Sequence, residues 1–289
     1  MKTGFIGLGA MGYPMARNLH KASLLAGVWN RSNEKAEQFA KETGAIAFKD
    51  IESLARECEC VVTCVSADAD VLAVVDVLVE HLPEGTLVID CSTVSAETAK
   101  QAAKKLATRN IGFLDCPVSG GTEGAIHATL AIMCGGEEKD FERAQPVLHA
   151  MGKRIALMGT VGSGQATKAV NQIAVAGVNQ AVSEALAFAR AHGLDLNKVI
   201  DVVGSGAAAS WFLTNRGRNM ERMSFPLGFK VTLHEKDLGI CKRMAETFDV
   251  QLPIVEMTLL HYRRLAAAGH GDEDISSLYR LKRAMFDKS

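Results

Sequence analysis

The sequence has no long apolar run and no excess of charge of either sign. No stretch approaches the roughly 20 apolar residues that a transmembrane helix needs. Lysine and arginine number 32 against 33 acidic residues, which leaves a net charge of −1 at pH 7. Such a balance gives no bulk attraction to nucleic acid or to an anionic membrane, so we expect neither as a partner. The first residues enter a strand pattern at once, which leaves no room for a signal peptide and predicts a cytoplasmic protein.

The cysteines lack the pattern of a disulfide framework or of a zinc site. There are seven, an odd number, and most lie within apolar runs, as is typical of reduced core thiols in a cytosolic protein. Cys58, Cys60 and Cys64 are close together, but their spacing matches no common set of zinc ligands. We therefore predict no metal site.

Strand-like and helix-like runs alternate in the first half of the chain, and strand patterns are missing from the second half. The strand-like runs lie at 3–7, 27–29, 45–48, 61–65, 87–90, 113–115, 130–134 and 155–158. The helix-like runs between them lie at 11–21, 50–58, 70–81, 95–109 and 138–151. This order predicts a Rossmann-type α/β domain with a doubly wound, largely parallel sheet. The later runs, at 197–203, 210–223, 231–248, 253–268 and 276–286, predict an all-α C-terminal domain.

The longest helical pattern joins the two halves, from about residue 165 to residue 192. It stops at Gly193, a residue suited to a left-handed C-cap. Its apolar residues cover most of the helix circumference, so we expect the helix to be buried. The predicted divisions are the α/β domain at 1–161, a long interdomain helix at 162–192 and the all-α domain at 193–289.

A G-x-G-x-x-G motif follows the first strand and opens the first helix. It consists of Gly7, Leu8, Gly9, Ala10, Met11 and Gly12. In this context the first glycine makes a tight turn, the second lets the backbone approach a pyrophosphate, and the third lets helix pack on strand. The N–H groups at the helix start would hold the phosphates. We predict a dinucleotide site here; the alternative is a glycine-rich turn without a nucleotide.

The second strand ends in Asn30, Arg31 and Ser32, where NAD enzymes usually carry Asp or Glu for the ribose 2′-hydroxyl. No carboxylate in this segment would repel a 2′-phosphate. Arg31 can stack on adenine and pair with the phosphate, while Asn30 and Ser32 can donate hydrogen bonds. The segment favours NADP(H), with NAD(H) still possible; the alternative is a solvated arginine at a strand end.

Three loops follow the carboxyl ends of predicted parallel strands, which is where such sheets bind ligands. They are 65–67, 91–93 and 116–121. In the last loop, Ser119, Gly120 and Gly121 offer a hydroxyl and N–H groups with little side-chain bulk. That chemistry suits a small carboxylate or carbonyl. The alternative is a β-turn with no ligand.

The start of the long helix carries Lys168, Asn171 and Gln172, at i, i+3 and i+4 on one face. A lysine in a mostly apolar helix is costly unless it is paired or used, and the alternative is a lysine that snorkels at a helix end. Further on, Lys236 and Asp237 could form a solvated helix face, and His234 is expected on a helix surface.

With these residues the chain resembles the β-hydroxyacid dehydrogenases, a family that includes 3-hydroxyisobutyrate dehydrogenase and tartronate semialdehyde reductase. Four segments carry the resemblance, in the family's order, and together they extend over essentially the whole chain. They are 7–19, the dinucleotide signature; 115–121, the substrate loop; 162–172, the catalytic helix; and 236–238, the C-terminal signature.

The resemblance implies a 6-phosphogluconate dehydrogenase-like fold and reversible oxidation of a 3-hydroxy acid by NAD or NADP. By resemblance, Lys168 and Asn171 are catalytic, with Lys168 as the acid/base. The implied substrate-binding residues are Ser119, Gly120, Gly121, Gln172 and Phe229. Beyond the glycine motif and 30–32, the implied cofactor-binding residues are Val65, Ser66, Thr93, Lys236 and Asp237, of which the last two would close over the cofactor from the second domain.

Two departures leave the substrate open. Many members carry asparagine at the position of Gln172, and glutamine there is similar to the tartronate semialdehyde branch. Residues 122–125, in contrast, look more like hydroxyisobutyrate-type members. Glyoxylate or succinic semialdehyde reduction is a further alternative. Cys116 replaces a commoner alanine.

In the expected mechanism, Lys168 donates a proton to the substrate oxygen during reduction and takes the hydroxyl proton during oxidation. Because lysine has an ordinary pKa of about 10.4, burial would have to lower it for such a base to act at neutral pH. The rival functions are imine reduction, although imine reductases of the family usually lack the lysine, and a non-catalytic dinucleotide-binding module. The helical second domain also predicts a homodimer or homotetramer.

Overall fold

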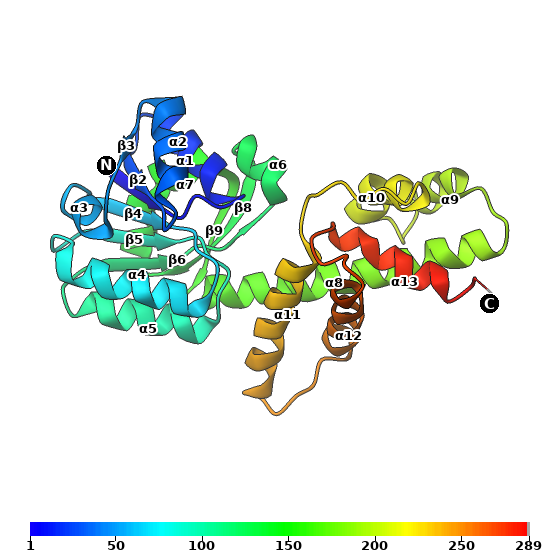
Figure 1. The fold of residues 1–289 in the computed structure, drawn as a ribbon. Helices are drawn as coiled ribbons and strands as arrows, with labels where there is room; N and C mark the ends of the chain where they lie inside the picture. Colours follow the sequence, from blue (N-terminus) through cyan, green and yellow to red (C-terminus); the bar gives the residue numbers. More distant parts are fainter. Residues whose placement is uncertain (288–289) are drawn as a thin grey trace. The chain divides into compact units, whose positions relative to one another are not determined.

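The computed structural model describes residues 1–287, and the chain falls into two compact units, residues 1–168 and 169–289 (Figure 1). Lys288 and Ser289, the last residues of the predicted 193–289 domain, lie outside the described part. The predicted divisions after residues 161 and 192 stay predictions.

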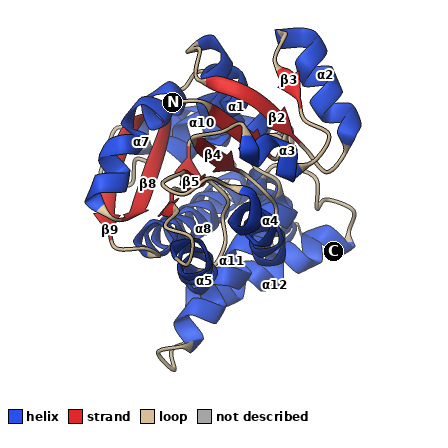
Figure 2. Cartoon of the chain, turned by 90° about the vertical axis from the view of Figure 1, so that its left-hand side faces the viewer, coloured by secondary structure: helices blue, strands red, loops and turns tan. Residues whose placement is uncertain are grey.

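The first unit is built on one nine-stranded sheet. Its strands are β1 (Thr3–Ile6), β2 (Leu25–Trp29), β3 (Ile46–Ala47), β4 (Cys60–Thr63), β5 (Leu87–Asp90), β6 (Gly112–Asp115), β7 (Val118–Ser119), β8 (Leu130–Gly136) and β9 (Gly152–Gly159). They lie in the order β3-β2-β1-β4-β5-β6-β8-β7, with β9 paired to β8. β1 to β6 are parallel, whereas β8 runs antiparallel to β6 and β7. Figure 2 shows β3 beside α2 at one edge of the sheet and β9 at the other.

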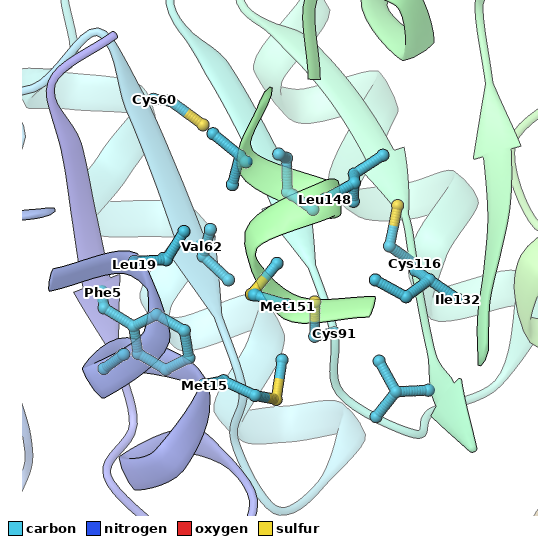
Figure 3. Packing of buried hydrophobic residues seen from close by; sticks show 14 of the residues in the cluster. Phe5, Met15, Leu19, Cys60, Val62, Cys91, Cys116, Ile132, Leu148 and Met151 are labelled. Atoms are coloured by element: carbon cyan, nitrogen blue, oxygen red, sulfur yellow. The ribbon is translucent and has the colours of Figure 1, made fainter. Parts of the chain in front are cut away.

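Helices cover both faces of the sheet, as the alternating pattern predicts. They are α1 (Gly12–Lys21), α2 (Asn33–Thr43), α3 (Ile51–Arg56), α4 (Asp68–His81), α5 (Ala96–Ala107), α6 (Gly121–Ile126) and α7 (Glu138–Met151). Successive strand residues point to opposite faces. Phe5 therefore packs in the cluster that includes α1, α2, α6 and α7, and its neighbour Ile6 packs against α3, α4 and α5. Figure 3 shows Phe5 near Met15 of α1, with Met151 of α7 in the same cluster.

Two helices of the first unit were not predicted from the sequence. In α2 only Ala36 and Phe39 are buried, so the apolar stripe of this helix is narrow. The helix has a recognisable stop signal, because its C-cap residue is Gly44 with a left-handed φ of 79°. α6 begins at Gly121, within the segment predicted to be an open loop, and is six residues long. Short helices with narrow apolar faces leave little periodicity to detect.

The second unit is helical. It takes in most of α8 (Ser163–Ala191), a helix that begins in the first unit, followed by α9 (Leu196–Val203), α10 (Trp211–Glu221), α11 (Val231–Glu246), α12 (Pro253–Ala267), the 3₁₀ turn η1 (Ile275–Ser277) and α13 (Leu278–Ala284). Its core includes Leu186, Leu238 and Tyr262. The predicted fold class, a Rossmann-type domain followed by an all-α domain, is confirmed.

The expectation that the long helix is buried does not hold along its whole length. Phe188, near its C-terminal end, is 54 % exposed. No helix within residues 1–287 is both long and apolar enough to cross a membrane.

Six of the seven cysteines are buried, and Cys64 is half-buried. Burial raises the pKa of the Cys58 and Cys60 thiols to about 12. These thiols stay protonated near neutral pH, as suits residues of an apolar core.

Candidate active site

The carboxyl ends of the parallel strands meet at one edge of the first unit. β1, β4, β5 and β6 run in the same direction, so the segments that follow them leave the sheet on the same side. Those segments are the glycine motif and the three loops predicted to bind ligands. The topology therefore brings the candidate cofactor and substrate residues of this unit to one edge.

The glycine motif forms a turn in which Gly7 and Gly12 cannot carry a side chain. Gly7 has a φ of 101°, which favours glycine, and its N–H donates to the Trp29 carbonyl at 3.0 Å. A Cβ on Gly12 would overlap the carbonyl oxygen of Gly7, so the close approach of α1 to β1 requires glycine. Gly9, in contrast, faces open space, and α1 starts three residues later with Met11 as its N-cap. An open glycine before a helix N-terminus fits a dinucleotide pyrophosphate.

Asn30 braces this turn. Its side-chain oxygen accepts a hydrogen bond from the N–H of Leu8 at 2.8 Å, and its amide nitrogen donates to the Ser32 carbonyl at 3.0 Å. Ser32 is the N-cap residue of α2. Both polar groups of the Asn30 side chain thus bond the protein, which ties the end of β2 to the glycine motif.

Arg31 lies at the surface beside a carboxylate. Its side chain is 83 % exposed, and Nη1 lies 3.2 Å from Oδ1 of Asp70, in the first turn of α4. The sequence showed no acidic residue in the segment 30–32, but folding supplies one from 39 residues away. The expectation holds for the segment itself, whereas in the folded chain Asp70 lies beside the guanidinium that was expected to bind a 2′-phosphate.

The loops after β4 and β5 are held together by a buried carboxylate that sequence reasoning missed. Asp90 Oδ1 accepts hydrogen bonds from the hydroxyls of Thr63 at 2.7 Å and Ser92 at 2.6 Å. The Ser92 hydroxyl in turn accepts from the N–H of Val65 at 2.9 Å. These bonds fix Val65 and the half-buried Thr93 on neighbouring loops, with the exposed Ser66 next to Val65. An aspartate at the end of an apolar strand, followed by Ser-Thr, was the available signal.

The N-terminus of α8 is anchored on another buried carboxylate. Asp115, the last residue of β6, accepts hydrogen bonds from the backbone N–H of Gly162 at 2.7 Å and of Gln165 at 2.8 Å. Burial raises the pKa of Asp115 to about 6, and the two backbone hydrogen bonds oppose that rise. A Cβ on Gly164 would overlap the carbonyl oxygens of Asp115 and Met133, so the helix starts in direct contact with the sheet.

Gln165, in the first turn of α8, binds the loop that contains Thr93. Its side-chain nitrogen donates to the Ser92 carbonyl at 2.8 Å, and its side-chain oxygen accepts from the N–H of Val94 at 3.2 Å. The side chain is buried, and its partners lie 73 and 71 residues earlier in the sequence. The start of α8 is thus attached to the loops after both β5 and β6.

Lys168 lies three residues after Gln165 on α8 and points into the loop after β6. The residue is 8 % exposed, and Nζ donates to the carbonyl oxygen of Val118 at 2.8 Å. Val118 precedes Ser119, Gly120 and Gly121, the predicted cradle. Gly120 has a φ of 132° and Gly121 a φ of 63°, so the backbone turns there in a way that favours glycine. The ammonium group therefore lies beside the segment predicted to hold a carboxylate.

The predicted site residues of the second unit also gather around one another. The Gln172 side-chain nitrogen donates to Oδ2 of Asp237 at 2.6 Å, and its oxygen accepts from the Asn171 amide at 2.8 Å. Asp237 Oδ1 lies 3.1 Å from Nζ of Lys236. Asp237 is 4 % exposed, so it does not belong to a solvated helix face.

His234 is fully buried in this cluster, and the expectation of a surface histidine is wrong. Its Nε2 lies 3.2 Å from the Gln172 carbonyl oxygen and its Nδ1 3.0 Å from the Tyr262 hydroxyl. The Phe229 ring packs on it with a centroid separation of 5.4 Å. The N–H of Phe229 donates to Oδ2 of Asp274 at 2.9 Å, which fixes that segment.

Comparison with known proteins gives two family matches. Residues 2–162 match the NAD binding domain of 6-phosphogluconate dehydrogenase, and residues 162–282 match the family described as NAD-binding of NADP-dependent 3-hydroxyisobutyrate dehydrogenase. Together the matches extend over nearly the whole chain, and they show that the protein binds an NAD(P) dinucleotide.

Relatives match along their full length. An uncharacterized oxidoreductase of Shewanella frigidimarina is 39 % identical over 282 residues, 96 % of each chain. The 2-hydroxy-3-oxopropionate reductase of Escherichia coli is 34 % identical over 288 residues, 99 % of this chain and 98 % of its own. Among solved structures, Mycobacterium tuberculosis 3-hydroxyisobutyrate dehydrogenase with L-serine has a TM-score of 0.89 at 29 % identity, covering 98 % of this chain and 99 % of that one.

The family matches, the full-length relatives and the fold agree with the four sequence segments that carry the resemblance. The chain belongs to the β-hydroxyacid dehydrogenase family, the NAD(P)-dependent oxidoreductases acting on CH–OH groups that include 3-hydroxyisobutyrate dehydrogenase.

Proposed function

We propose that the protein interconverts a small 3-hydroxy acid and its semialdehyde, with Lys168 as the general acid/base and NADP(H) preferred over NAD(H). One observation carries the proposal. The buried Nζ of Lys168 donates to the carbonyl of Val118, directly before Ser119 and Gly120. A proton donor is thereby held at the entrance of a segment suited to a carboxylate.

Lys168 supplies the proton in the reductive direction and accepts it in the oxidative direction. A substrate oxygen that displaces the Val118 carbonyl from Nζ would take its place in the hydrogen bond. Proton transfer by a positioned side chain contributes about 10²- to 10⁴-fold to rate. Asp115 binds the backbone at the start of α8, and the Gln165 side chain binds the Ser92 carbonyl. These hydrogen bonds hold Lys168 in position while substrate and product exchange.

Ser119, Gly120 and Gly121 are the proposed carboxylate site. The Ser119 residue is half-buried and Gly120 is exposed, so the segment is accessible while its backbone is fixed by β7 and α6. Backbone N–H groups at positive-φ glycines and a hydroxyl form the kind of concavity that binds anions. This anchor would orient the hydroxyl-bearing carbon toward Lys168.

Asn171 and Gln172 are proposed to orient the substrate or the lysine. The Gln172 amide is fixed by Asp237, and Asn171 is fixed by Gln172. An amide held at both ends presents its remaining groups in one orientation, which lowers the entropy cost of positioning.

The nicotinamide cofactor, when bound, supplies or accepts the hydride. The residues of this chain that fit it are Gly7, Gly9 and Gly12, with the N-terminus of α1 for its phosphates. The preference for NADP(H) is supported by Arg31, whose exposed guanidinium suits a 2′-phosphate.

The substrate class is supported by the relatives and by the anion-binding segment. The Escherichia coli relative is a 2-hydroxy-3-oxopropionate reductase, and the Mycobacterium tuberculosis structure contains L-serine, a 3-hydroxy acid. We propose tartronate semialdehyde or methylmalonate semialdehyde as the aldehyde, with succinic semialdehyde and glyoxylate as the further candidates.

The test is a matrix of initial rates with the purified protein. NADPH and NADH are crossed with the semialdehydes of methylmalonate, tartronate and succinate and with glyoxylate, and the oxidised cofactors with 3-hydroxyisobutyrate and serine. We expect one dominant aldehyde and a preference for NADPH. Absence of turnover across the matrix, in protein that binds NADPH in a fluorescence titration, would refute the proposed reaction.

We also propose that the protein is a homodimer or homotetramer formed through its helical unit. Large apolar side chains of that unit are exposed in the single chain, among them Trp211 at 61 % and Phe248 at 80 %. Exposed apolar patches of this kind commonly mark protein contacts. Light scattering at micromolar concentration should report a multiple of 30.9 kDa, and a monomer would contradict the proposal.

A further inference from the structure

The guanidinium of Arg31 is already paired with a carboxylate of the protein. Its Nη1 lies 3.2 Å from Oδ1 of Asp70, and the Asp70 side chain is 32 % exposed. Asp70 lies in the first turn of α4, which follows β4, whereas Arg31 follows β2. The sheet order β2-β1-β4 places the ends of these two strands on either side of the glycine motif.

The neighbouring acidic residue in the same turn has a different task. Asp68 Oδ1 accepts hydrogen bonds from the N–H of Ser95 at 2.9 Å and from the hydroxyl of Thr98 at 2.6 Å, so Asp68 attaches α4 to α5. Asp70 instead pairs with the arginine that is proposed to read the cofactor. The carboxylate missing from the end of β2 is thus supplied by another element.

We propose that Asp70 is a specificity-determining residue that competes with the 2′-phosphate of NADP for Arg31. The inference rests on the proposed role of Arg31 in binding that phosphate. Asp70 therefore holds the preference for NADP(H) below the level that Arg31 alone would give. NADH carries a 2′-hydroxyl in place of the phosphate, so Asp70 imposes no such cost on it.

The physical reason is that one guanidinium cannot satisfy both anions equally. Arginine binds phosphate best through two parallel N–H donors. To offer both donors to the phosphate, Arg31 must release Asp70. An exposed ion pair is worth about 0.2–1 kcal/mol, which corresponds to at most about a fivefold change in affinity. Because the pair is at the surface, added salt should reduce the effect.

The experiment measures dissociation constants of NADPH and NADH by nicotinamide fluorescence, with the full-length protein at low and high salt. The variants are Asp70→Asn, Arg31→Ala and the double variant. Asp76→Asn is the matched control, because Asp76 lies on the same helix, loses the same charge and pairs with Lys105 instead. Circular dichroism confirms that each variant is folded.

We expect Asp70→Asn to tighten NADPH by about two- to fivefold at low salt and to leave NADH unchanged. Asp76→Asn should change neither, and in the Arg31→Ala background Asp70→Asn should no longer tighten NADPH. Unchanged or weaker NADPH binding in Asp70→Asn, or equal tightening of NADPH and NADH, would overturn the inference.

The Arg31→Ala variant separates this inference from the proposed function. If Arg31→Ala weakens NADPH and Asp70→Asn has no effect, the competition is refuted and the role of Arg31 stands. If Arg31→Ala leaves NADPH binding unchanged, both the role of Arg31 and the competition are refuted.

Discussion

Replacing Gln165 with alanine should loosen the first turn of α8 and the loop that contains Thr93. The side chain bridges the Ser92 carbonyl at 2.8 Å and the Val94 N–H at 3.2 Å, and all three residues are buried. Alanine leaves both backbone groups without that partner. Each buried polar group left unsatisfied costs about 1–3 kcal/mol, so we expect the free energy of unfolding to fall by roughly 2–6 kcal/mol.

A glutamate at the same position gives a sharper test, because it has nearly the same shape. Its carboxylate can still accept from Val94, but its second oxygen would face the Ser92 carbonyl without a proton between them. Burial disfavours the charged form, so the introduced carboxyl should have a raised pKa. Once protonated, it can donate to Ser92. The Glu variant should therefore regain stability as the pH is lowered from 8 to 5, relative to the Ala variant.

The assay is urea unfolding followed by circular dichroism at several pH values, with the Glu and Ala variants compared at each. Gln101→Ala, on the exposed face of α5, is the control and should change the free energy of unfolding by less than about 0.5 kcal/mol. A loss in Gln165→Ala no larger than in Gln101→Ala, or a Glu variant that stays parallel to the Ala variant over this pH range, would refute the bridging role of Gln165.

Two further predictions concern the glycine motif and the buried aspartate. Gly12→Ala should destabilise the protein, because its Cβ would overlap the Gly7 carbonyl, whereas Gly9→Ala should fold normally and weaken NADPH binding. Urea unfolding measures the first effect and fluorescence titration the second. Equal behaviour of the two variants in both assays would contradict the geometry. The pKa of Asp115 is raised to about 6, so the stability of the protein relative to Asp115→Asn should fall as the pH rises from about 4 through 6, where the buried carboxyl has to ionise. The unfolding free energy of the wild type minus that of Asp115→Asn should become more negative by about 3 kcal/mol from pH 4 to pH 7, and a constant difference would argue against the raised pKa.

The sequence predicted those features that depend on local pattern. Alternating apolar runs are enough to indicate a doubly wound sheet, and the glycine motif can be located because its spacing reflects one turn between a strand and a helix. Gly7 and Gly12 contact each other over five positions, so their requirement for glycine is visible in the sequence itself.

The sequence did not predict contacts that fold topology creates. Asp70 meets Arg31 only because β2 and β4 flank β1, across 39 residues of sequence. Gln165 contacts Ser92 across 73 residues of sequence, and no local pattern predicts that contact. Arg31 therefore looked unopposed in the sequence, and the hydrogen-bonding role of Gln165 was not detected.

Burial of polar side chains was the other source of error. His234 lies in a polar run of α11, which suggested a surface position, but it is fully buried against Phe229 and Tyr262. Its two ring nitrogens lie within 3.0 and 3.2 Å of Tyr262 and Gln172. A buried histidine with two partners cannot be told from an exposed one by helical periodicity alone.

The role of Lys168 as general acid/base is tested by the turnover of Lys168→Ala with the best aldehyde of the rate matrix, measured together with the NADPH dissociation constant of the variant. Lys104→Ala, on the exposed surface of α5, is the control. We expect Lys168→Ala to bind NADPH as the wild type does but to lose about 10²- to 10⁴-fold in kcat, because the proton donor beside Val118 is gone. Turnover close to that of the wild type and of Lys104→Ala would remove Lys168 from the mechanism.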